Sequence, residues 1–172
     1  LEGILREKIS DKGFLRLVGK LIRAPIEVNG KAERSKIGCP QGSIISPILS
    51  NIYLHHVVDN WFHGISKSHL KGRADMVRFA DDMVFVFQFK EDAKKFYKVL
   101  PKRLEKYGLK LHEDKSSMLR SGSKAAEEAD KRGERLPVYK FLGFVCYWGR
   151  SRKGWWRMKY KSRPDRFTGK LK

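Results

Sequence analysis

The sequence predicts an α+β fold, in which an antiparallel sheet is backed by helices. Segments whose apolar residues recur at helical spacing come first along the chain, and short strand-like runs separated by turn residues follow. This grouping of helices and strands is typical of the α+β class. With 172 residues and 41% hydrophobic content, the chain is also long enough to form a domain with its own core.

Two helices and a small hairpin are expected first. Residues 1–9 start with apolar residues and without methionine, as a fragment would that begins partway into a helix. Asp11 can cap a second helix, which Pro25 ends. The apolar positions of this helix recur at helical spacing and are expected to pack in the core: Phe14, Leu17, Val18, Leu21 and Ile22. Asn29-Gly30 is a two-residue turn signal and predicts a hairpin within residues 26–37.

A rigid loop, residues 38–47, leads into a long apolar segment, residues 48–62. Glycines and prolines restrict the loop backbone, and Gly42 and Ser43 bring N–H groups next to a helix start. That geometry suits phosphate or base-paired nucleic acid, and an ordinary start of a helix is the alternative. The helix is apolar on most sides and is expected to be largely buried. Structural or surface roles, rather than metal binding, are favoured for its histidines: His55, His56 and His63.

Two adjacent carboxylates, Asp81 and Asp82, interrupt a strand-forming apolar run within residues 75–89. Like charges about 4 Å apart repel by roughly 4 kcal/mol at an effective dielectric of about 20, and flanking apolar residues add a desolvation cost. A cationic partner is therefore expected. The pattern predicts a β-hairpin that presents both carboxylates near its turn to a divalent metal, Mg²⁺ being typical where phosphates are handled. An Asp-Asp turn without a metal is the alternative.

The second half of the chain is predicted to hold one helix and several strands. The helix starts at Glu91, is kinked by Pro101 and ends at Gly108. Gly143 marks a bulge or tight bend in the last strand. Residues 121–135 are polar and charged, and are expected to form an exposed loop. Three segments have strand-like patterns: residues 109–112, 115–119 and 138–147.

The balance of charge indicates a polyanionic partner. The formal net charge is +19, and the last 24 residues hold ten Lys and Arg against one Asp. Self-repulsion of this size is tolerated most easily beside a polyanion, so nucleic acid is favoured over an anionic membrane surface. No apolar run is long enough for a membrane span, and nothing near the start resembles a signal peptide. Cys39 and Cys146 are too few for a disulfide framework or a zinc site, which favours a reducing, intracellular location.

Residues 148–161 interleave aromatic and cationic side chains. The aromatic residues can stack on bases. Alternatively they belong to a half-buried strand in which Trp156, Met158 and Tyr160 point inward. Because phosphate contacts are ionic, affinity for RNA is expected to fall steeply with added salt. Six cations are the candidates for nucleic-acid binding: Arg150, Arg152, Lys153, Arg157, Lys159 and Lys161.

Four motifs in order resemble those of the reverse transcriptases of group II introns and their bacterial relatives. They are Gly38-x-Pro40-Gln41-Gly42-x-x-x-Ser46-Pro47, Phe79-Ala80-Asp81-Asp82, Leu109-x-Leu111 before Lys115, and Phe141-Leu142-Gly143-Phe144. The resemblance covers nearly the whole chain and is strongest to the intron-encoded maturases of these retroelements, which also bind intron RNA and assist splicing. It implies a reverse-transcriptase palm-like fold in residues 1–148 and a basic segment, residues 149–172, leading towards a thumb or RNA-binding region.

The implied activity is that of an RNA-directed DNA polymerase, a nucleotidyltransferase that uses two metal ions. The alternative is an RNA-binding splicing factor, a maturase, that keeps the polymerase fold with little or no polymerase activity. The resemblance makes Asp81 a metal ligand and Asp82 its partner, with Mg²⁺ as the cofactor and Mn²⁺ as a substitute. Lys115 takes the place of a basic residue near the leaving pyrophosphate, and a plain surface lysine is the alternative.

Two further groups of residues take their roles from the resemblance. The template base or incoming nucleotide would be positioned by Pro40, Gln41, Gly42, Ser43, Phe79 and Ala80. The primer grip would be formed by Phe141, Leu142 and Gly143, which without the resemblance are a core strand with a bend. Three positions depart from the family pattern: Cys39 stands where threonine is usual, Ser43 where glycine is frequent, and Phe79 where tyrosine is commoner.

A further catalytic aspartate, which the family carries on a strand before the first helix of this chain, has no counterpart here. Asp11 lies at a predicted helix start and Asp59 at the far end of the long helix. The fingers and the thumb have no counterpart either. The resemblance thus implies the palm of a longer enzyme, poorly active or inactive alone. Its implied partners are an RNA template, a DNA primer, a dNTP and intron RNA, without a membrane, inside a bacterium or an organelle.

Overall fold

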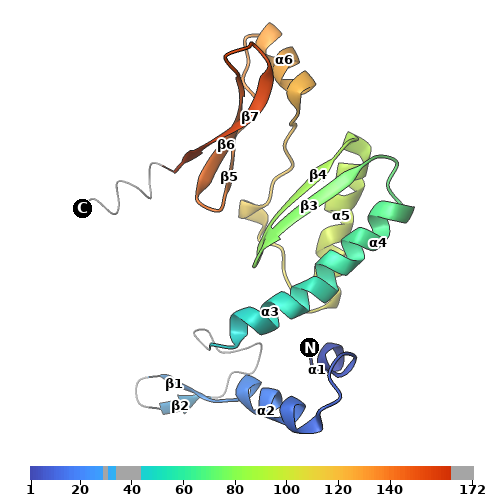
Figure 1. The fold of residues 1–172 in the computed structure, drawn as a ribbon, viewed down its shortest axis with the longest axis vertical. Coiled ribbons are helices and arrows are strands. Elements are labelled where there is room, and N and C mark those ends of the chain that lie inside the picture. The colour runs from blue at the N-terminus through green and yellow to red at the C-terminus, as the bar shows by residue number, and fades with distance from the viewer. Residues whose placement is uncertain (29–30, 34–43, 164–172) are drawn as a thin grey trace, which may run out of the picture. The chain divides into compact units, whose positions relative to one another are not determined.

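A computed structural model describes residues 1–28, 31–33 and 44–163 (Figure 1). The chain forms two compact units, Leu1–Lys110 and Leu111–Lys172. Among the described residues, the strands form three separate sheets in which all neighbouring strands are antiparallel. Helices together with antiparallel sheets make up the α+β class, as the sequence predicts.

The first unit opens with four short elements. In chain order they are α1 (Glu2–Arg6), α2 (Lys12–Ile22), β1 (Ile26–Val28) and β2 (Lys31–Glu33). The predicted cap of α2 is confirmed, because Asp11 Oδ1 accepts hydrogen bonds from the backbone N–H groups of Gly13 at 2.7 Å and Phe14 at 3.0 Å. β1 and β2 pair antiparallel, which confirms the predicted hairpin. Its turn, Asn29-Gly30, lies outside the described residues.

The buried side of α2 is narrower than the sequence predicts. A small core joins α2 to α1 and to the following helix through Leu5, Val18 and Leu49. Ile22 packs at the edge of this core. An α-helix turns about 100° per residue, so the remaining apolar residues lie on the other side of Val18, and no described residue buries them. The expectation of core packing is therefore wrong for Phe14, Leu17 and Leu21, which are exposed.

A long helix with a π-helical turn at its centre runs from Ser46 to Ser68 (Figure 1). Its parts are α3 (Ser46–Leu54), η1 (His55–Asp59) and α4 (Asn60–Ser68). The predicted helix over residues 48–62 is thus confirmed and continues beyond Phe62. Burial is confirmed only in part, since Val57, Val58 and Phe62 are buried whereas Ile48 is exposed. Leu49 is buried against α1 and α2, but Ile44 and Ile48 have no covering element among the described residues.

The predicted hairpin is confirmed and packs on helices through aromatic residues. The elements are β3 (Ala74–Phe79), β4 (Asp82–Phe87) and α5 (Lys90–Lys106). Phe62, Phe85, Phe87 and Phe96 form a cluster in which the ring centroids lie 4.6 to 6.2 Å apart. Aromatic pairs at this spacing stabilise a core beyond the area they bury. The cluster therefore fixes one face of the hairpin on α4 and α5.

The second unit differs from the sequence prediction in its first half. Residues 109–112 and 115–119 form no strands, and residues 113–115 form the turn η2 (Glu113–Lys115). Residues 121–135 contain the helix α6 (Ser123–Lys131) instead of an exposed loop. Short strand patterns need a neighbouring strand, and none pairs with them among the described residues. α6 forms because three alanines share one face of the helix and are buried, although most of its other residues are charged. The buried alanines are Ala125, Ala126 and Ala129.

Residues 138–147 form two strands of a three-stranded sheet, not the single strand predicted. The strands are β5 (Tyr139–Phe141), β6 (Phe144–Arg150) and β7 (Trp156–Ser162). The tight bend predicted at Gly143 is confirmed as the second residue of the turn between β5 and β6. The strand predicted for the aromatic residues of the basic segment is confirmed as β7. Inward packing is wrong for Met158 and Tyr160, because Met158 is exposed and Tyr160 is 73% exposed.

No helix in the part of the chain that the structure describes combines the length and the apolar character that a membrane span requires.

Candidate functional site

The turn between β3 and β4 carries the two aspartates. Phe79 and Asp82 face each other as the last strand pair, so Ala80 and Asp81 form a two-residue turn. Ala80 has a left-handed φ of 52°, a conformation that costs a residue with a Cβ on the order of 1 kcal/mol. Asp81 and Asp82 are both exposed. Among the described residues neither carboxylate has a hydrogen bond or an ion pair, so the predicted cationic partner is not found there.

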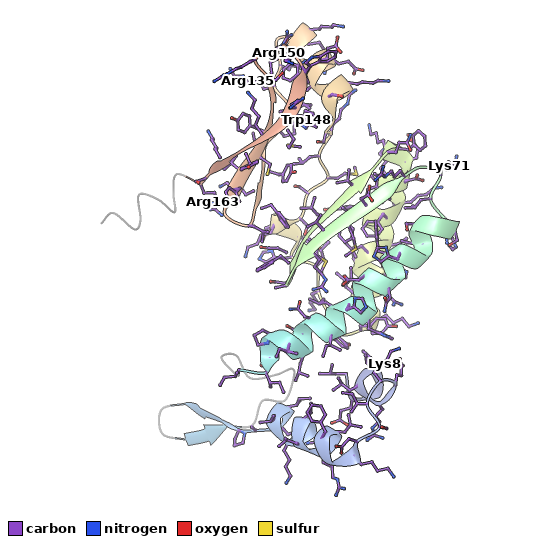
Figure 2. All side chains as sticks on the ribbon, viewed as in Figure 1. Lys8, Lys71, Arg135, Trp148, Arg150 and Arg163 are labelled. Atoms are coloured by element: carbon purple, nitrogen blue, oxygen red, sulfur yellow. The ribbon has the colours of Figure 1, made fainter. Side chains whose placement is uncertain are left out.

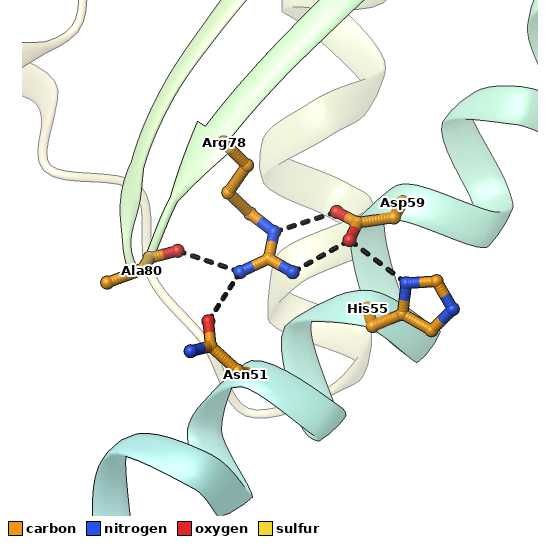
Figure 3. A network of polar contacts seen from close by, with 5 residues as sticks. All are labelled: Asn51, His55, Asp59, Arg78 and Ala80. Atoms are coloured by element: carbon orange, nitrogen blue, oxygen red, sulfur yellow. Dashed lines mark hydrogen bonds and ion pairs between the residues drawn. The ribbon is translucent and has the colours of Figure 1, made fainter.

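Arg78 connects this turn to the long helix (Figure 3). Its guanidinium donates from Nε to Asp59 Oδ1 at 2.8 Å and from Nη2 to Asp59 Oδ2 at 2.7 Å. Nη1 donates both to Asn51 Oδ1 at 2.9 Å and to the Ala80 carbonyl at 3.0 Å. The side chains of Arg78 and Asp59 are only 11% and 15% exposed. A bidentate, sheltered pair of this kind is stronger than a surface salt bridge.

The charges of the pair stabilise each other. Burial by itself would raise the pKa of Asp59, but hydrogen bonds from Arg78 and His55, together with their charge, hold this pKa below its usual value of 3.8. The hydrogen bond to Asp59 raises the pKa of Arg78 above its usual value, against the opposing effect of burial. His55 Nδ1 lies 3.1 Å from Asp59 Oδ2. Arg78 and Asp59 are therefore both ionised near neutral pH.

A pH-dependent stability follows from the lowered pKa of Asp59. Because the pKa is lower in the folded state, the contribution of the ion pair is fully present above about pH 4 and is lost as the pH falls through the folded-state pKa. We expect Asp59→Asn to lower the free energy of unfolding by about 2 kcal/mol at pH 7, and this difference to shrink below pH 3.8. Urea unfolding followed by the amide signals of Val57 and Val58 measures it. A difference between the two proteins that is the same at pH 7 and pH 2.5 would contradict the assignment.

The described residues do not make up a complete metal site. They contain no group of three or more His, Cys, Asp or Glu side chains placed to hold an ion. Asp11 caps α2 and Asp59 is occupied by Arg78, so neither adds a ligand to the turn. Asp81 and Asp82 are chemically suited to a divalent cation. Within the part of the chain that the structure describes, these two carboxylates therefore fall short of a full ligand set.

The other predicted site residues fall in three places. Phe79 lies beside the turn and is 65% exposed. Four loop residues predicted to position a nucleotide lie outside the described part of the chain: Pro40, Gln41, Gly42 and Ser43. Lys115 is exposed at the end of η2, in the second unit. Leu142 and Gly143 form the turn between β5 and β6, with Phe141 as the last residue of β5. The roles of all these residues stay predictions.

The register of the second sheet sorts its side chains onto two faces. Lys140, Val145 and Lys161 are aligned across β5, β6 and β7. Because side chains alternate along a strand, Arg157 and Lys159 of β7 lie on the same face as Lys161. Lys159 donates from Nζ to the Arg150 carbonyl at 2.6 Å. Lys140, Arg157 and Lys161 are exposed. We call these three residues the basic face.

Arg150 lies on the opposite face of the sheet and is engaged with α6. It forms an ion pair with Asp130 at 2.6 Å, and its guanidinium lies 5.2 Å from the ring centroid of Trp156. Trp148, which is labelled with Arg150 in Figure 2, lies on the same face and donates from Nε1 to Ser121 Oγ at 2.8 Å. Arg150 is therefore less available to phosphates than the basic face. Arg152 and Lys153 are exposed in the turn between β6 and β7.

Sequence reasoning missed the residues that hold the turn and one member of the basic face. Arg78 could have been found, because it occupies an inward-facing position of β3 in line with Ala74 and Met76. A cation at such a position needs a sheltered carboxylate. Asn51 carries no comparable signal, since an exposed Asn on a helix is common. Lys140 was missed because residues 138–147 were predicted as one strand.

The sequence profile of the family described as "Reverse transcriptase (RNA-dependent DNA polymerase)" matches residues 5–146. The chain belongs to this family, which in general uses divalent metals, and the resemblance drawn from the four motifs is confirmed. Among similar proteins, the "Putative COX1/OXI3 intron 1 protein" of Saccharomyces cerevisiae is 47% identical over 70 residues, which are 40% of this chain and 8% of that protein. The "Group II intron-encoded protein LtrA" of Lactococcus lactis is 39% identical over 57 residues, 33% of this chain and 10% of that protein.

A third relative is "Protein YkfC" of Escherichia coli, 39% identical over 70 residues, which are 41% of this chain and 17% of that protein. The matched part of this chain thus spans less than a fifth of each of these relatives.

Proposed function

We propose that this chain is the palm part of an RNA-directed DNA polymerase of the group II intron type. The observation that carries the proposal is the pair Asp81 and Asp82, exposed at a hairpin turn that Arg78 fixes to the long helix, in a chain of the reverse transcriptase family. Two adjacent carboxylates without a partner among the described residues repel each other. A bound cation would remove that repulsion.

The proposed reaction is nucleotidyl transfer. The primer 3′ hydroxyl attacks the α-phosphate of a dNTP, a new phosphodiester bond forms, and pyrophosphate leaves. Divalent metals, when bound, activate the hydroxyl and neutralise the charge of the leaving group. Asp81 and Asp82 would contribute two of the carboxylates, with Mg²⁺ as the favoured ion. The further carboxylate is proposed to lie outside this chain, so we expect the 172-residue chain alone to extend primers poorly or not at all.

The remaining predicted residues would bind and orient the nucleic acid. Phe79 and Ala80 lie beside the aspartates and would contact the incoming nucleotide or the template base. Lys115 would stand near the pyrophosphate. The apolar turn at Leu142 would contact the primer, and the basic face would neutralise backbone phosphates. The proposed partners are an RNA template, a DNA primer and intron RNA, in the bacterium or organelle where such introns are transcribed.

The turn at Leu142 supports a role in binding because its residues are not those that favour stability. Leu142 and Gly143 have φ values of 49° and 83°, the pattern of a type I′ turn, for which Asn-Gly is preferred. Leu142 is also 42% exposed, so it gains little from burial. An apolar residue in a left-handed conformation on the surface is a reason to look for a ligand.

Replacing Leu142 by asparagine is expected to have opposite effects on stability and activity. The hairpin of β5 and β6 should become more stable by about 1 kcal/mol, because asparagine tolerates the left-handed conformation. Primer extension by a longer protein that contains this chain should fall. Amide exchange at Phe141 and Phe144 measures the first effect. If the hairpin is stabilised and primer extension is unchanged, Leu142 is not part of a primer grip.

The second candidate is an RNA-binding splicing factor that keeps the polymerase fold. The net charge of +19 and the relatives described as intron proteins favour it. Primer extension on an RNA template separates the two functions. It should be measured with this chain alone and with a longer protein that contains it. Tight RNA binding without extension by the longer protein would favour the splicing factor.

A further inference from the structure

Arg78 holds the turn of the hairpin at one defined place on the long helix. Four of its five N–H groups are used: two by Asp59, one by Asn51 and one by the Ala80 carbonyl. Only the last of these acceptors belongs to the turn. The guanidinium therefore bridges the backbone of the turn and two side chains of one helix (Figure 3).

The turn needs such a bridge. A two-stranded hairpin is marginally stable by itself, and the aromatic cluster that anchors this one involves β4 residues nearer its other end, Phe85 and Phe87. Asp81 and Asp82 have no hydrogen bond or ion pair within the described part of the chain. Ala80 also keeps an unfavourable left-handed φ. The bond from Arg78 to the Ala80 carbonyl is thus the side-chain contact, among those the structure describes, that fixes the turn.

The π-helical turn aligns the two helical acceptors. Asn51 and Asp59 are eight residues apart, and in an uninterrupted α-helix they would differ by about 80° around the axis. η1 (His55–Asp59) ends at Asp59 and has more residues per turn than an α-helix, which removes much of that difference. Both oxygens can then reach one guanidinium. A π-helical turn that brings two residues of one helix to the same side chain is consistent with a functional role.

We propose that Arg78 is a positioning residue for Asp81 and Asp82, and that Asn51 and Asp59 hold its guanidinium in place. That Asp81 and Asp82 bind a metal rests on the proposed function. That Arg78 holds the turn in place does not. Lysine cannot replace Arg78 in this role. Its single ammonium lacks the planar fork that binds one carboxylate twice and two further oxygens at the same time.

Amide hydrogen exchange of the 172-residue chain tests the fixing of the turn. In Arg78→Lys, residues 80–83 should exchange about tenfold faster or more, whereas Val57, Val58 and Phe96 in the core should accelerate much less, because the lysine ammonium can still pair with Asp59. Arg73→Lys is the matched control, since Arg73 lies just before the same strand and pairs with the exposed Asp75. Equal acceleration at the turn and in the core would reduce Arg78 to a structural ion pair, and unchanged exchange at the turn would overturn the proposal.

Substitutions of Asn51 add a rescue test on the exposed side of the helix. Asn51→Leu removes the acceptor and should loosen the turn, whereas Asn51→Asp keeps an acceptor oxygen and should not. Broadening of the Asp81 and Asp82 amide signals by Mn²⁺ then reports cation binding. About ten times more Mn²⁺ should be needed in Arg78→Lys than in the natural chain, and equal concentrations would contradict the positioning of the carboxylates. If the natural chain shows no broadening, the metal assignment fails, and hydrogen exchange still decides the role of Arg78.

Discussion

Replacing Asp81 by asparagine is expected to reduce primer extension on an RNA template by about a thousandfold or more, in a longer protein that contains this chain. The substitution keeps the size of the side chain and removes one of the two charges that would hold a divalent cation at the hairpin turn. A loss of about 4 kcal/mol of transition-state stabilisation corresponds to that factor. Because Asp81 is exposed and has no partner among the described residues, the fold should be unaffected.

Asp75→Asn is the matched control for this experiment. Asp75 lies on β3 of the same hairpin, is exposed, and pairs with Arg73 at 3.0 Å. The Asp75→Asn variant loses one negative charge, as Asp81→Asn does, but near the start of β3 and away from the turn. Primer extension by Asp75→Asn should stay within about twofold of the natural protein, because surface ion pairs contribute little. Equal losses in both variants would mean that general charge, rather than a site at the turn, governs the activity.

Removing the three cations of the basic face is expected to weaken the dependence of RNA affinity on salt. Each phosphate contact with single-stranded nucleic acid contributes about 0.7 to the slope of log affinity against log salt concentration. Replacing Lys140, Arg157 and Lys161 by alanine should therefore reduce the slope by about 2. These residues lie on one face of the sheet and are exposed. Titrations of single-stranded RNA between 50 and about 300 mM salt measure the slope.

A second triple substitution controls for net charge. Arg120, Lys131 and Arg132 belong to the same unit and are paired with Glu128, Glu127 and Glu134 respectively. Their replacement by alanine changes the net charge by the same amount but removes cations that already have acidic partners. The salt slope should then change by well under 1. If both triple variants lower the slope equally, the RNA does not contact the basic face in preference to the rest of the unit.

The hairpin with the two aspartates could be predicted because several local signals agree. β-branched and aromatic residues flank a short polar interruption, and the neighbouring motifs have the order found in one family. The cap at Asp11 and the tight bend at Gly143 were predictable for the same reason: each depends on residues close in sequence. Local signals of this kind do not require knowledge of the tertiary structure.

Features that depend on distant residues were not predicted. The network of Arg78, Asn51 and Asp59 joins a strand to a helix about 20 to 30 residues earlier in the chain, and it depends on a π-helical turn that no residue type signals. α6 was predicted as a loop because most of its residues are charged, and its apolar face consists only of three small alanines. β5 and β6 were predicted as one strand because their turn contains leucine, where a type I′ turn usually has asparagine.

The most direct test of the central proposal is RNA-templated incorporation of dNTPs by a longer protein that contains this chain, measured with and without Mg²⁺. We predict a DNA product complementary to the template that forms only with the divalent metal and is lost in Asp81→Asn but not in Asp75→Asn. A protein that binds RNA tightly yet makes no such product, or one whose extension survives the loss of Asp81, would contradict the assignment of this hairpin as part of a polymerase site.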